Sequence, residues 1–324
     1  MKAILIKEDK SLAWENVPDP IIGDNDVLIK VAYAALNRAD LMQREGDYPP
    51  PPGAPEWMGL EVSGKIVAAG KNVTAYKPGD KVCALLGGGG YAEYVAVRSD
   101  HCMPVPGNTT MAEAAAMPEA FATAYLNLFM EGKAKAGDTL LMNAGKSGLA
   151  SVVIPMAKAF GMRVITTVRG ENAVKSISHL NADIVVDTLV SDISEVLARQ
   201  LENGHGVDVA IDCLGGEIMG KCLHFLNHGA RWIVIAALAG KLTEIDLKNI
   251  YVRNVRIIGS TLRSRPDSVK ADILRRLTEN VWDKVSDGEI KPHIYKILPV
   301  ACAEEAHAIL QNGENTGKVV LKVE

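Results

Sequence analysis

The sequence has little of what would tie it to a membrane or to nucleic acid. Its net charge of −4 offers no basic patch for a polyanion. No apolar run approaches the ~20 residues that cross a bilayer, and the longest is WIVIAALAG. The opening residues MKAILIKEDK turn charged too soon for a signal peptide. We therefore expect a cytoplasmic protein that binds neither membranes nor nucleic acid.

Cysteines are few and scattered. The chain has five, with no C-x-x-C pair among them: Cys83, Cys102, Cys213, Cys222 and Cys302. This distribution predicts a reducing compartment, no disulfide framework and no cysteine-cluster metal site. The content of 48% hydrophobic and 23% charged residues is ordinary for a globular enzyme.

The pattern of expected secondary structure changes near residue 120. Residues 1–105 contain short strands between turns, such as DVLIKVAYAAL and EVSGKIVAAG, which predicts a mostly antiparallel β domain. From about residue 120 to 260, strands such as TLLMN, RVITTV and RWIVIAA alternate with helices, which predicts a doubly wound parallel sheet. Two later strands, HIYKILPV and KVVLKV, are expected to return to the first domain. The predicted class is α/β, with a β domain of residues 1–121 and 262–324 interrupted by a Rossmann dinucleotide-binding domain of residues 122–261.

The segment LLMNAGKSGLASVVIPMAKAFG joins a strand to a helix through a loop of small residues. Its Gly-Lys-Ser resembles a P-loop, but that motif needs a glycine where this chain has Leu140. The Rossmann template G-x-G-x-x-G/A fits better, with Gly145, Ser147 and Ala150 at its small positions. The helix is expected to begin near Gly148 and to direct its unpaired amides at a diphosphate. An ordinary strand–helix turn is the alternative. The candidate cofactor-binding residues of the loop are Gly145, Lys146, Ser147, Gly148 and Leu149.

A β domain interrupted by a Rossmann domain, with the ordered motifs ALNRADL, GLEVSG, KPGDKV, YAEYV, FATAY and GKVVL, resembles the medium-chain dehydrogenase/reductase superfamily. The segments ALNRADLMQREGDYPPPPGAP, LLGGGGYAEYVAV and STLRSR are similar to its quinone oxidoreductase branch, and most similar to the p53-inducible quinone reductase subgroup. The resemblance implies that the β domain is GroES-like and carries the substrate site. It also implies a homodimer in which VRIIGST, at the sheet edge, pairs with its twin.

The resemblance raises the question of zinc. Alcohol dehydrogenases of this superfamily place Cys, His and usually Cys where this chain has Asn37, Leu60 and Glu119. An amide and an aliphatic side chain cannot replace thiolate and imidazole ligands. We therefore expect no metal, and no Lewis acid to deprotonate an alcohol. Reduction of an already electron-poor acceptor is the chemistry that remains.

The cofactor is expected to be NADPH. The position that distinguishes NADPH from NADH lies about 20 residues beyond the glycine loop, at the end of the second strand, and here it is Arg169. A cation can bind the 2′-phosphate, whereas a carboxylate would repel it. Lys175 is a second candidate contact, and Glu171 is a rival acid of the NAD type. The alternative for Arg169 is a solvated loop cation.

Further cofactor contacts follow from the resemblance. Thr123 corresponds to a threonine near the nicotinamide, and Ala237 follows the fifth strand at the edge where open α/β sheets bind ligands. Arg263 and Arg265 are candidates to reach the diphosphate or to close the cleft, with a surface pair at the domain junction as the alternative. Lys318 is expected to be an ordinary strand-edge lysine.

Asn37 and Tyr48 are the candidate catalytic residues. The Asn37 amide can hydrogen-bond a quinone oxygen or cap the helix that follows. Tyr48, on the proline-rich loop, can stack on the substrate, donate a proton or a hydrogen bond, or pack against proline. With neither metal nor flavin, NADPH itself supplies the hydride. The sequence therefore predicts an NADPH-dependent quinone oxidoreductase.

Two other functions stay open. An enoyl or alkenal reductase, which reduces a C=C bond, needs the same cofactor and the same apolar slot. A non-catalytic NADPH-binding redox sensor is favoured by the degenerate loop. It is also favoured by Ala173 and Thr188, which stand where the family places a lysine and a tyrosine near the phosphate.

Overall fold

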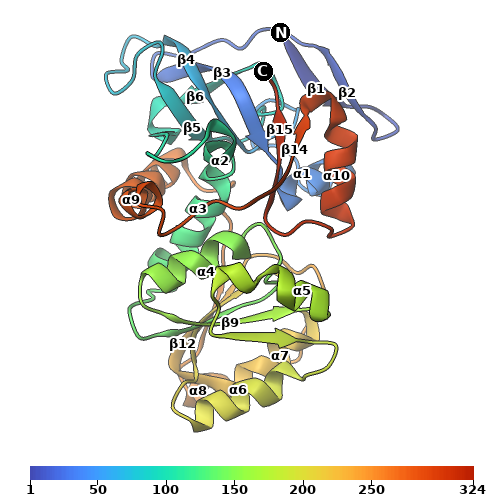
Figure 1. Ribbon diagram of the computed structural model, residues 1–324, viewed down its shortest axis with the longest axis vertical. Helices are drawn as coiled ribbons and strands as arrows, with labels where there is room; N and C mark the ends of the chain where they lie inside the picture. Colours follow the sequence, from blue (N-terminus) through green and yellow to red (C-terminus); the bar gives the residue numbers. More distant parts are fainter. The chain divides into compact units, whose positions relative to one another are not determined.

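The computed structural model describes residues 1–324 without a gap, and the chain forms two units. The first unit comprises Met1–Ala122 and Leu262–Glu324, and the second comprises Thr123–Thr261. The second unit is therefore one continuous segment inserted into the first, as the colour sequence of Figure 1 shows. None of the helices combines the length and the apolar character that a bilayer-crossing segment requires.

The first unit is built on a seven-stranded sheet in the order β14–β15–β3–β4–β5–β7, with β6 also paired to β3. Strand β3 runs antiparallel to β4, β6 and β15, whereas β14 and β15 are parallel. A separate antiparallel pair is formed by β1 and β2. The strands are β1 (Lys2–Ile6), β2 (Leu12–Asn16), β3 (Asp26–Ala35), β4 (Glu61–Ala69), β5 (Lys81–Leu85), β6 (Tyr94–Arg98), β7 (Cys102–Pro104), β14 (Ile294–Pro299) and β15 (Lys318–Lys322).

Alternation along β3 explains how this sheet builds its core. The residues Val27, Ile29 and Val31 are buried while their neighbours in sequence are partly exposed, as a strand with one buried face requires. The helices of the unit are α1 (Arg38–Glu45), α2 (Met111–Ala115), α3 (Pro118–Tyr125, which crosses into the second unit), α9 (Asp267–Ser286) and α10 (Ala303–Gln311), with short 3₁₀ turns at Ser99–His101 and Val300–Cys302.

The second unit is a six-stranded sheet in the order β10–β9–β8–β11–β12–β13, with every neighbouring pair parallel. In chain order this is the 3-2-1-4-5-6 arrangement of a Rossmann fold. Helices α4 and α5 cover one face, and α6, α7 and α8 cover the other (Figure 1). The central strand β8 is buried along its whole length, whereas β13 is a largely exposed edge strand.

The strands of the second unit are β8 (Thr139–Met142), β9 (Arg163–Val168), β10 (Ile184–Asp187), β11 (Val207–Asp212), β12 (Leu226–Val234) and β13 (Arg256–Gly259). Its helices are α4 (Ala150–Ala159), α5 (Glu171–Ser176), α6 (Ile193–Glu202), α7 (Gly216–Cys222) and α8 (Leu247–Val252). A π-helix continues α3 at Leu126–Glu131, and 3₁₀ turns lie at Ser178–Leu180 and Leu223–Phe225.

The predicted α/β class, with an antiparallel sheet and a parallel doubly wound sheet, is confirmed. The predicted return of the last strands to the first domain is also confirmed, because β15 pairs with β3 and places Val320 opposite Ala35. Strands β2 and β7 were not predicted. Both are short, and neither has the strict alternation of buried and exposed residues that marks β3.

Candidate active site

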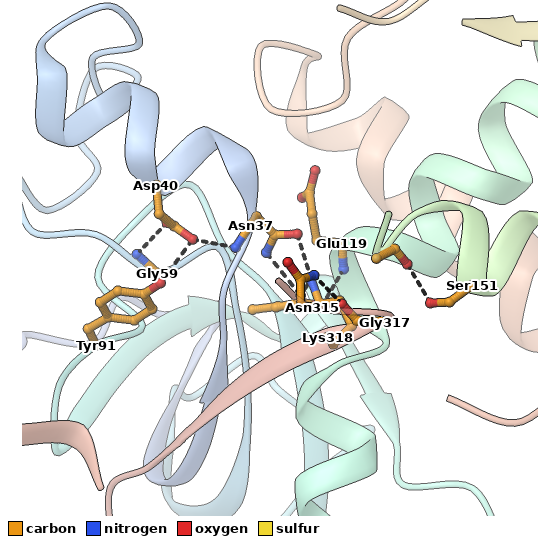
Figure 2. A network of polar contacts seen from close by, with 11 residues as sticks. Asn37, Asp40, Gly59, Tyr91, Glu119, Ser151, Asn315, Gly317 and Lys318 are labelled. Carbon is orange, nitrogen blue, oxygen red and sulfur yellow. Dashed lines mark hydrogen bonds and ion pairs between the residues drawn. The ribbon is translucent and has the colours of Figure 1, made fainter. Parts of the chain in front are cut away.

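Three chain segments converge at one edge of the seven-stranded sheet. Strand β3 ends at Ala35, and β4 and β15, which both run antiparallel to it, begin at Glu61 and Lys318. Asn37 follows β3 as the N-cap residue of α1. The topology therefore brings Asn37, Glu61 and Lys318 together, although 281 positions separate Asn37 from Lys318. Figure 2 shows Asn37 and Lys318 meeting at this edge.

Lys318 and Glu61 form a buried ion pair. The Lys318 Nζ lies 2.6 Å from Glu61 Oε1, and the two side chains are 4% and 0% exposed. Lys318 Nζ also donates to Asn37 Oδ1 at 2.7 Å, and Asn37 Nδ2 donates to Glu61 Oε1 at 2.9 Å. The prediction of an ordinary strand-edge lysine is therefore wrong. The Lys318 ammonium is enclosed in the first unit and held by two oxygen acceptors.

Asn37 and Asp40 form a capping box at the start of α1, and the Asn37 carboxamide also reaches Glu61 and Lys318. Asp40 Oδ2 accepts a hydrogen bond from the Asn37 backbone N–H at 2.7 Å, within the first turn of the helix. The predicted position of Asn37 at the helix cap is thus confirmed, but its carboxamide is turned toward Glu61 and Lys318. A carboxamide nitrogen carries two hydrogens, and Asn37 is partly exposed. Its contact with an acceptor oxygen stays a prediction.

Asp40 is a buried carboxyl beside this network. In addition to the Asn37 N–H, it accepts hydrogen bonds from Tyr91 Oη at 3.0 Å and from Gly59 N at 3.2 Å (Figure 2). Burial raises the pKa of Asp40 to about 6, although these hydrogen bonds oppose the shift. Gly59 has φ +107°, and a Cβ there would lie 2.5 Å from the Tyr91 nitrogen. Glycine is therefore required for this amide to approach Asp40.

Glu119 is a second carboxyl with an unusual environment. It is the second residue of α3, and its backbone N–H donates to Glu61 Oε2 at 2.9 Å. In Figure 2 its carboxyl points away from the Lys318 side chain, and the residue remains partly exposed. Desolvation, followed by the neighbouring Glu61 carboxylate, raises the pKa of Glu119 to about 8. Glu119 therefore holds a proton at neutral pH.

Arg263 fixes the loop that carries Tyr48. Its guanidinium donates to Gly87 O and Gln43 Oε1, each at 2.7 Å, and to Tyr48 O at 3.1 Å. Its Cζ lies 5.1 Å from the centroid of the Tyr48 ring, which is a cation–π contact. The prediction that Arg263 reaches a diphosphate or closes a cleft is contradicted, because this side chain is 6% exposed and its donors are engaged within the first unit. The role of Arg265, which is partly exposed, stays a prediction.

The Tyr48 side chain is partly buried, and its ring contacts the Arg263 guanidinium. Desolvation and then the Glu119 carboxyl raise the pKa of Tyr48 above its ordinary value, while Arg263 opposes the shift. The effect of Glu119 on this pKa indicates that its carboxyl lies near the Tyr48 hydroxyl. The predicted catalytic role of Tyr48 stays a prediction.

In the second unit, the loop between β8 and α4 forms a tight strand–helix turn. A Cβ on Gly145 would lie 2.7 Å from Thr166 Oγ1, so the turn has no room for a side chain at this position. Ser147 Oγ accepts a hydrogen bond from Ala150 N at 3.1 Å, and α4 begins at Ala150. This contact caps the first turn, and Ser151 N donates to Ser147 O at 3.0 Å, so α4 starts within two residues of the predicted Gly148. The loop follows the carboxyl end of β8, which pairs with β11 at the point where the strand order reverses and open α/β sheets bind nucleotides.

Other predicted cofactor contacts lie near the carboxyl ends of the parallel strands. Arg169 directly follows the last residue of β9 and is exposed. Lys175 forms an exposed ion pair with Glu171 at 2.6 Å, so the second candidate cation and the rival acid contact each other. Ala237 lies three residues after β12 and is exposed. The tight glycine turn, the helix end and the exposed cation together fit a dinucleotide. The remaining predicted contacts, Thr123, Lys146, Gly148 and Leu149, are not tested by these features.

One residue that the sequence patterns did not single out is Asp212, which ends β11. Its carboxylate is fully buried and accepts hydrogen bonds from Leu214 N at 2.8 Å and from Asn143 Nδ2 and Trp232 Nε1, each at 3.1 Å. These contacts join β12 and the segments that follow β8 and β11 at the point where the strand order reverses. An acid at the end of the apolar strand VDVAID was the available signal.

Comparison with known proteins gives matches over both units. Residues 23–107 match the alcohol dehydrogenase GroES-like domain, and residues 148–279 match the zinc-binding dehydrogenase family. The chain is 30% identical to the quinone oxidoreductase of Homo sapiens over 305 residues, which cover 93% of this chain and 90% of that protein. It is 27% identical to the highly reducing polyketide synthase easB of Emericella nidulans over 97% of this chain, but only 12% of that protein. A mycobacterial protein solved in complex with NADPH is similar over the full length of both chains, with a TM-score of 0.85 and 26% identity.

The zinc that the second family description implies does not fit the residues present. The three positions that bind zinc in alcohol dehydrogenases hold Asn37, Leu60 and Glu119, of which Leu60 is an apolar side chain with 1% exposure. No group of three or more His, Cys, Asp or Glu side chains is arranged to hold a metal ion. The cation beside Asn37 is instead the Lys318 ammonium.

Proposed function

Because this chain belongs to the quinone-oxidoreductase-like branch of the medium-chain dehydrogenase/reductase superfamily, we propose that it reduces quinones with NADPH. It is an NAD(P)-dependent oxidoreductase of that superfamily, and the proposal concerns its acceptor and its choice of cofactor. The observation that carries the proposal is the network of Lys318, Glu61 and Asn37. It offers hydrogen-bond donors on a fixed frame but no set of metal ligands, which suits an acceptor that is already electron-poor.

The acceptor oxygen binds at the Asn37 amide. Glu61 Oε1 takes one Nδ2 hydrogen, and Lys318 fixes the rotation of the amide by donating to Oδ1. The second Nδ2 hydrogen is then directed by two buried partners, and it donates to a quinone oxygen. Arg263 contacts the Tyr48 ring and its backbone carbonyl, and Tyr48 supplies an aromatic face on which the quinone ring stacks.

The cofactor binds along the β8–α4 loop of the second unit, where NADPH supplies a hydride. The first turn of α4 directs its amides at the diphosphate, and Gly145 keeps the turn close to the sheet. Arg169 binds the 2′-phosphate from the end of β9. The similar mycobacterial protein that was solved with NADPH supports this choice of cofactor.

Steady-state oxidation of NADPH and NADH with 1,2-naphthoquinone tests the proposal. We expect the wild type to prefer NADPH. Replacing Arg169 by alanine should raise the KM for NADPH about 10- to 100-fold, because hydrogen bonds to charged groups contribute about 1.5–3 kcal/mol. The KM for NADH should not change. Arg199→Ala is the matched control, since it removes another exposed arginine of the second unit, from α6.

The outcomes separate the candidate functions. Equal use of NADH and NADPH by the wild type would contradict the role of Arg169. Reduction of enals or enoyl thioesters but not quinones would favour the C=C reductase, which the match to a reducing polyketide synthase supports. Tight NADPH binding without turnover on either acceptor would favour the redox sensor.

The homodimer is part of the same proposal. Strand β13 pairs only with β12, so its other edge is open, and it exposes 41% of Ile257. A second copy of β13 would cover this edge. Sedimentation that gives a monomer at micromolar concentration would contradict the pairing.

A further inference from the structure

Glu119 occupies a position that the proposed reaction has not yet used. Its backbone N–H is fixed to Glu61 Oε2 at 2.9 Å, so the first turn of α3 is anchored to the same carboxylate that holds Asn37 and Lys318. Figure 2 shows that the Glu119 carboxyl lies beyond Asn37 and points away from Lys318. The residue as a whole is partly exposed, while its carboxyl is strongly desolvated.

Charged groups from three other elements and from the turn that holds Arg263 act on this carboxyl. Glu61 of β4 and Asp40 of α1 disfavour its ionisation, whereas Lys318 of β15 and Arg263 favour it. Desolvation and Glu61 are the largest effects, and they raise the pKa of Glu119 to about 8. The positive end of α3 opposes them by about 0.3–1 kcal/mol, which is less than one pKa unit.

The Lys318 ammonium favours ionisation of Glu119 but does not cancel the rise in its pKa, because the ammonium is already paired with Glu61 and Asn37. Its Nζ contacts Glu61 Oε1 at 2.6 Å and Asn37 Oδ1 at 2.7 Å. Tyr48 is the other acid near the carboxyl, but its pKa is raised above its ordinary value and it is the weaker proton donor at neutral pH. Among these groups, Glu119 best matches the requirement that a general acid titrate near the working pH.

We propose that Glu119 is a catalytic residue, whose protonated carboxyl donates a proton to the acceptor oxygen held by Asn37. This inference rests on the proposed function and names its proton donor. The quinone gains a hydride, which carries two electrons, and its oxygen becomes an anion. The O–H bond of Glu119 breaks, a new O–H bond forms on the reduced quinone, and the neutral hydroquinone leaves. The Glu119 carboxylate then recovers a proton from solvent. In sum, one quinone, one NADPH and one proton give one hydroquinone and one NADP⁺.

The test is the pH dependence of quinone reduction by the wild type and by Glu119→Gln. The wild-type kcat should be constant below pH ~8 and fall about tenfold per pH unit above it, because only the protonated acid donates. Glu119→Gln keeps the shape of the side chain and removes the transferable proton. Its kcat should be about 10²-fold lower, at the weak end for general acids because hydroquinone anions also accept protons from water, and should not fall above pH 8. The KM for NADPH should not change.

Two further variants make the result specific. Glu119→Asp keeps a proton donor with a shorter side chain. Its kcat should therefore lie between those of Glu119→Gln and the wild type, and it should again decrease at high pH. Glu56→Gln applies the same chemical change to an exposed glutamate of the first unit and should leave the profile unchanged. Asp40, with a pKa of about 6, titrates below the pH range in which kcat is expected to fall. Tyr48, whose pKa is raised above its ordinary value, titrates above that range.

Infrared difference spectroscopy measures the proton directly. The wild type at pH 7 should show the carbonyl band of a protonated carboxylic acid that is absent in Glu119→Gln. Absence of that band, or full kcat with an unchanged pH profile in Glu119→Gln, would overturn the inference while leaving quinone reduction by the wild type intact. Failure of the wild type to reduce any quinone would instead overturn the proposed function, and this inference with it.

Discussion

Replacing Lys318 by methionine tests how strongly the buried ion pair stabilises the first unit. Methionine retains an apolar stem of similar length and removes the ammonium, so Glu61, which is 0% exposed, stays buried without its cation. Asn37 Oδ1 also loses its donor at 2.7 Å. Removing one partner of a buried pair costs about 3–5 kcal/mol. At ~2–4 °C per kcal/mol, the unfolding midpoint of this unit should fall by about 6–20 °C.

The assay is differential scanning calorimetry at pH 7, with three comparison variants. Lys322→Met removes an exposed lysine from the same strand and should change the free energy of unfolding by less than about 0.5 kcal/mol. Glu61→Gln leaves the Lys318 ammonium buried and should also destabilise. The double variant, with both charges removed, should recover most of the loss, because no unpaired charge is left inside the protein.

A clear result would refute this reasoning. If Lys318→Met loses less than about 1 kcal/mol and resembles Lys322→Met, then Glu61 does not carry an uncompensated charge in the variant. The ion pair would in that case be a consequence of the fold and not one of its supports. Equal losses in the single and double variants would show that the three side chains stabilise the unit by packing alone.

Two other changes in the first unit have defined outcomes. His307 in α10 is fully buried with neither ring nitrogen hydrogen-bonded, and desolvation lowers its pKa to about 4. The unfolded chain binds this proton more tightly, so the stabilisation is complete above pH ~6.5 and about 3 kcal/mol is lost as pH falls toward 4. His307→Leu should therefore flatten the pH dependence of urea unfolding between pH 7 and pH 4.5, and an unchanged slope would contradict this. Arg263→Lys keeps the charge but cannot reach Gly87 and Gln43 together, so we expect a loss of about 1–3 kcal/mol. Faster proteolysis should appear at the Tyr48 loop, and wild-type resistance there would show that Arg263 does not anchor it.

The fold was largely predictable because its signals are local. Each strand of the parallel sheet is an apolar run bounded by a turn, and the Gly145 turn lies directly between β8 and α4. The residues that determine these elements are near neighbours in sequence. The start of α4 at Ala150 lies within two residues of the predicted Gly148, and the Ser147 hydroxyl caps its first turn.

The candidate site was only half predictable because its contacts are not local. Asn37 could be found by its place after β3, but its partners lie 24 and 281 positions away. Nothing in the sequence around Lys318 distinguishes a buried lysine from an exposed one. The prediction for Arg263 was wrong for the same reason, since its acceptors lie in two distant segments, residues 43–48 and Gly87. The proton on Glu119 depends on a neighbour, Glu61, that only the folded chain brings near.

The insertion of one unit into the other has a consequence for how the protein is made on the ribosome. All of Thr123–Thr261 is synthesised as one stretch, so the second unit has its full set of strands before β15 exists. The first unit must wait, because β3 has no β15 beside it and Glu61 has no ammonium until Lys318 emerges. During that interval β3 has no partner on the side that β15 later covers, and the buried ion pair cannot form. The order of synthesis therefore allows the second unit to complete its sheet first, and it completes the Asn37–Glu61–Lys318 network last.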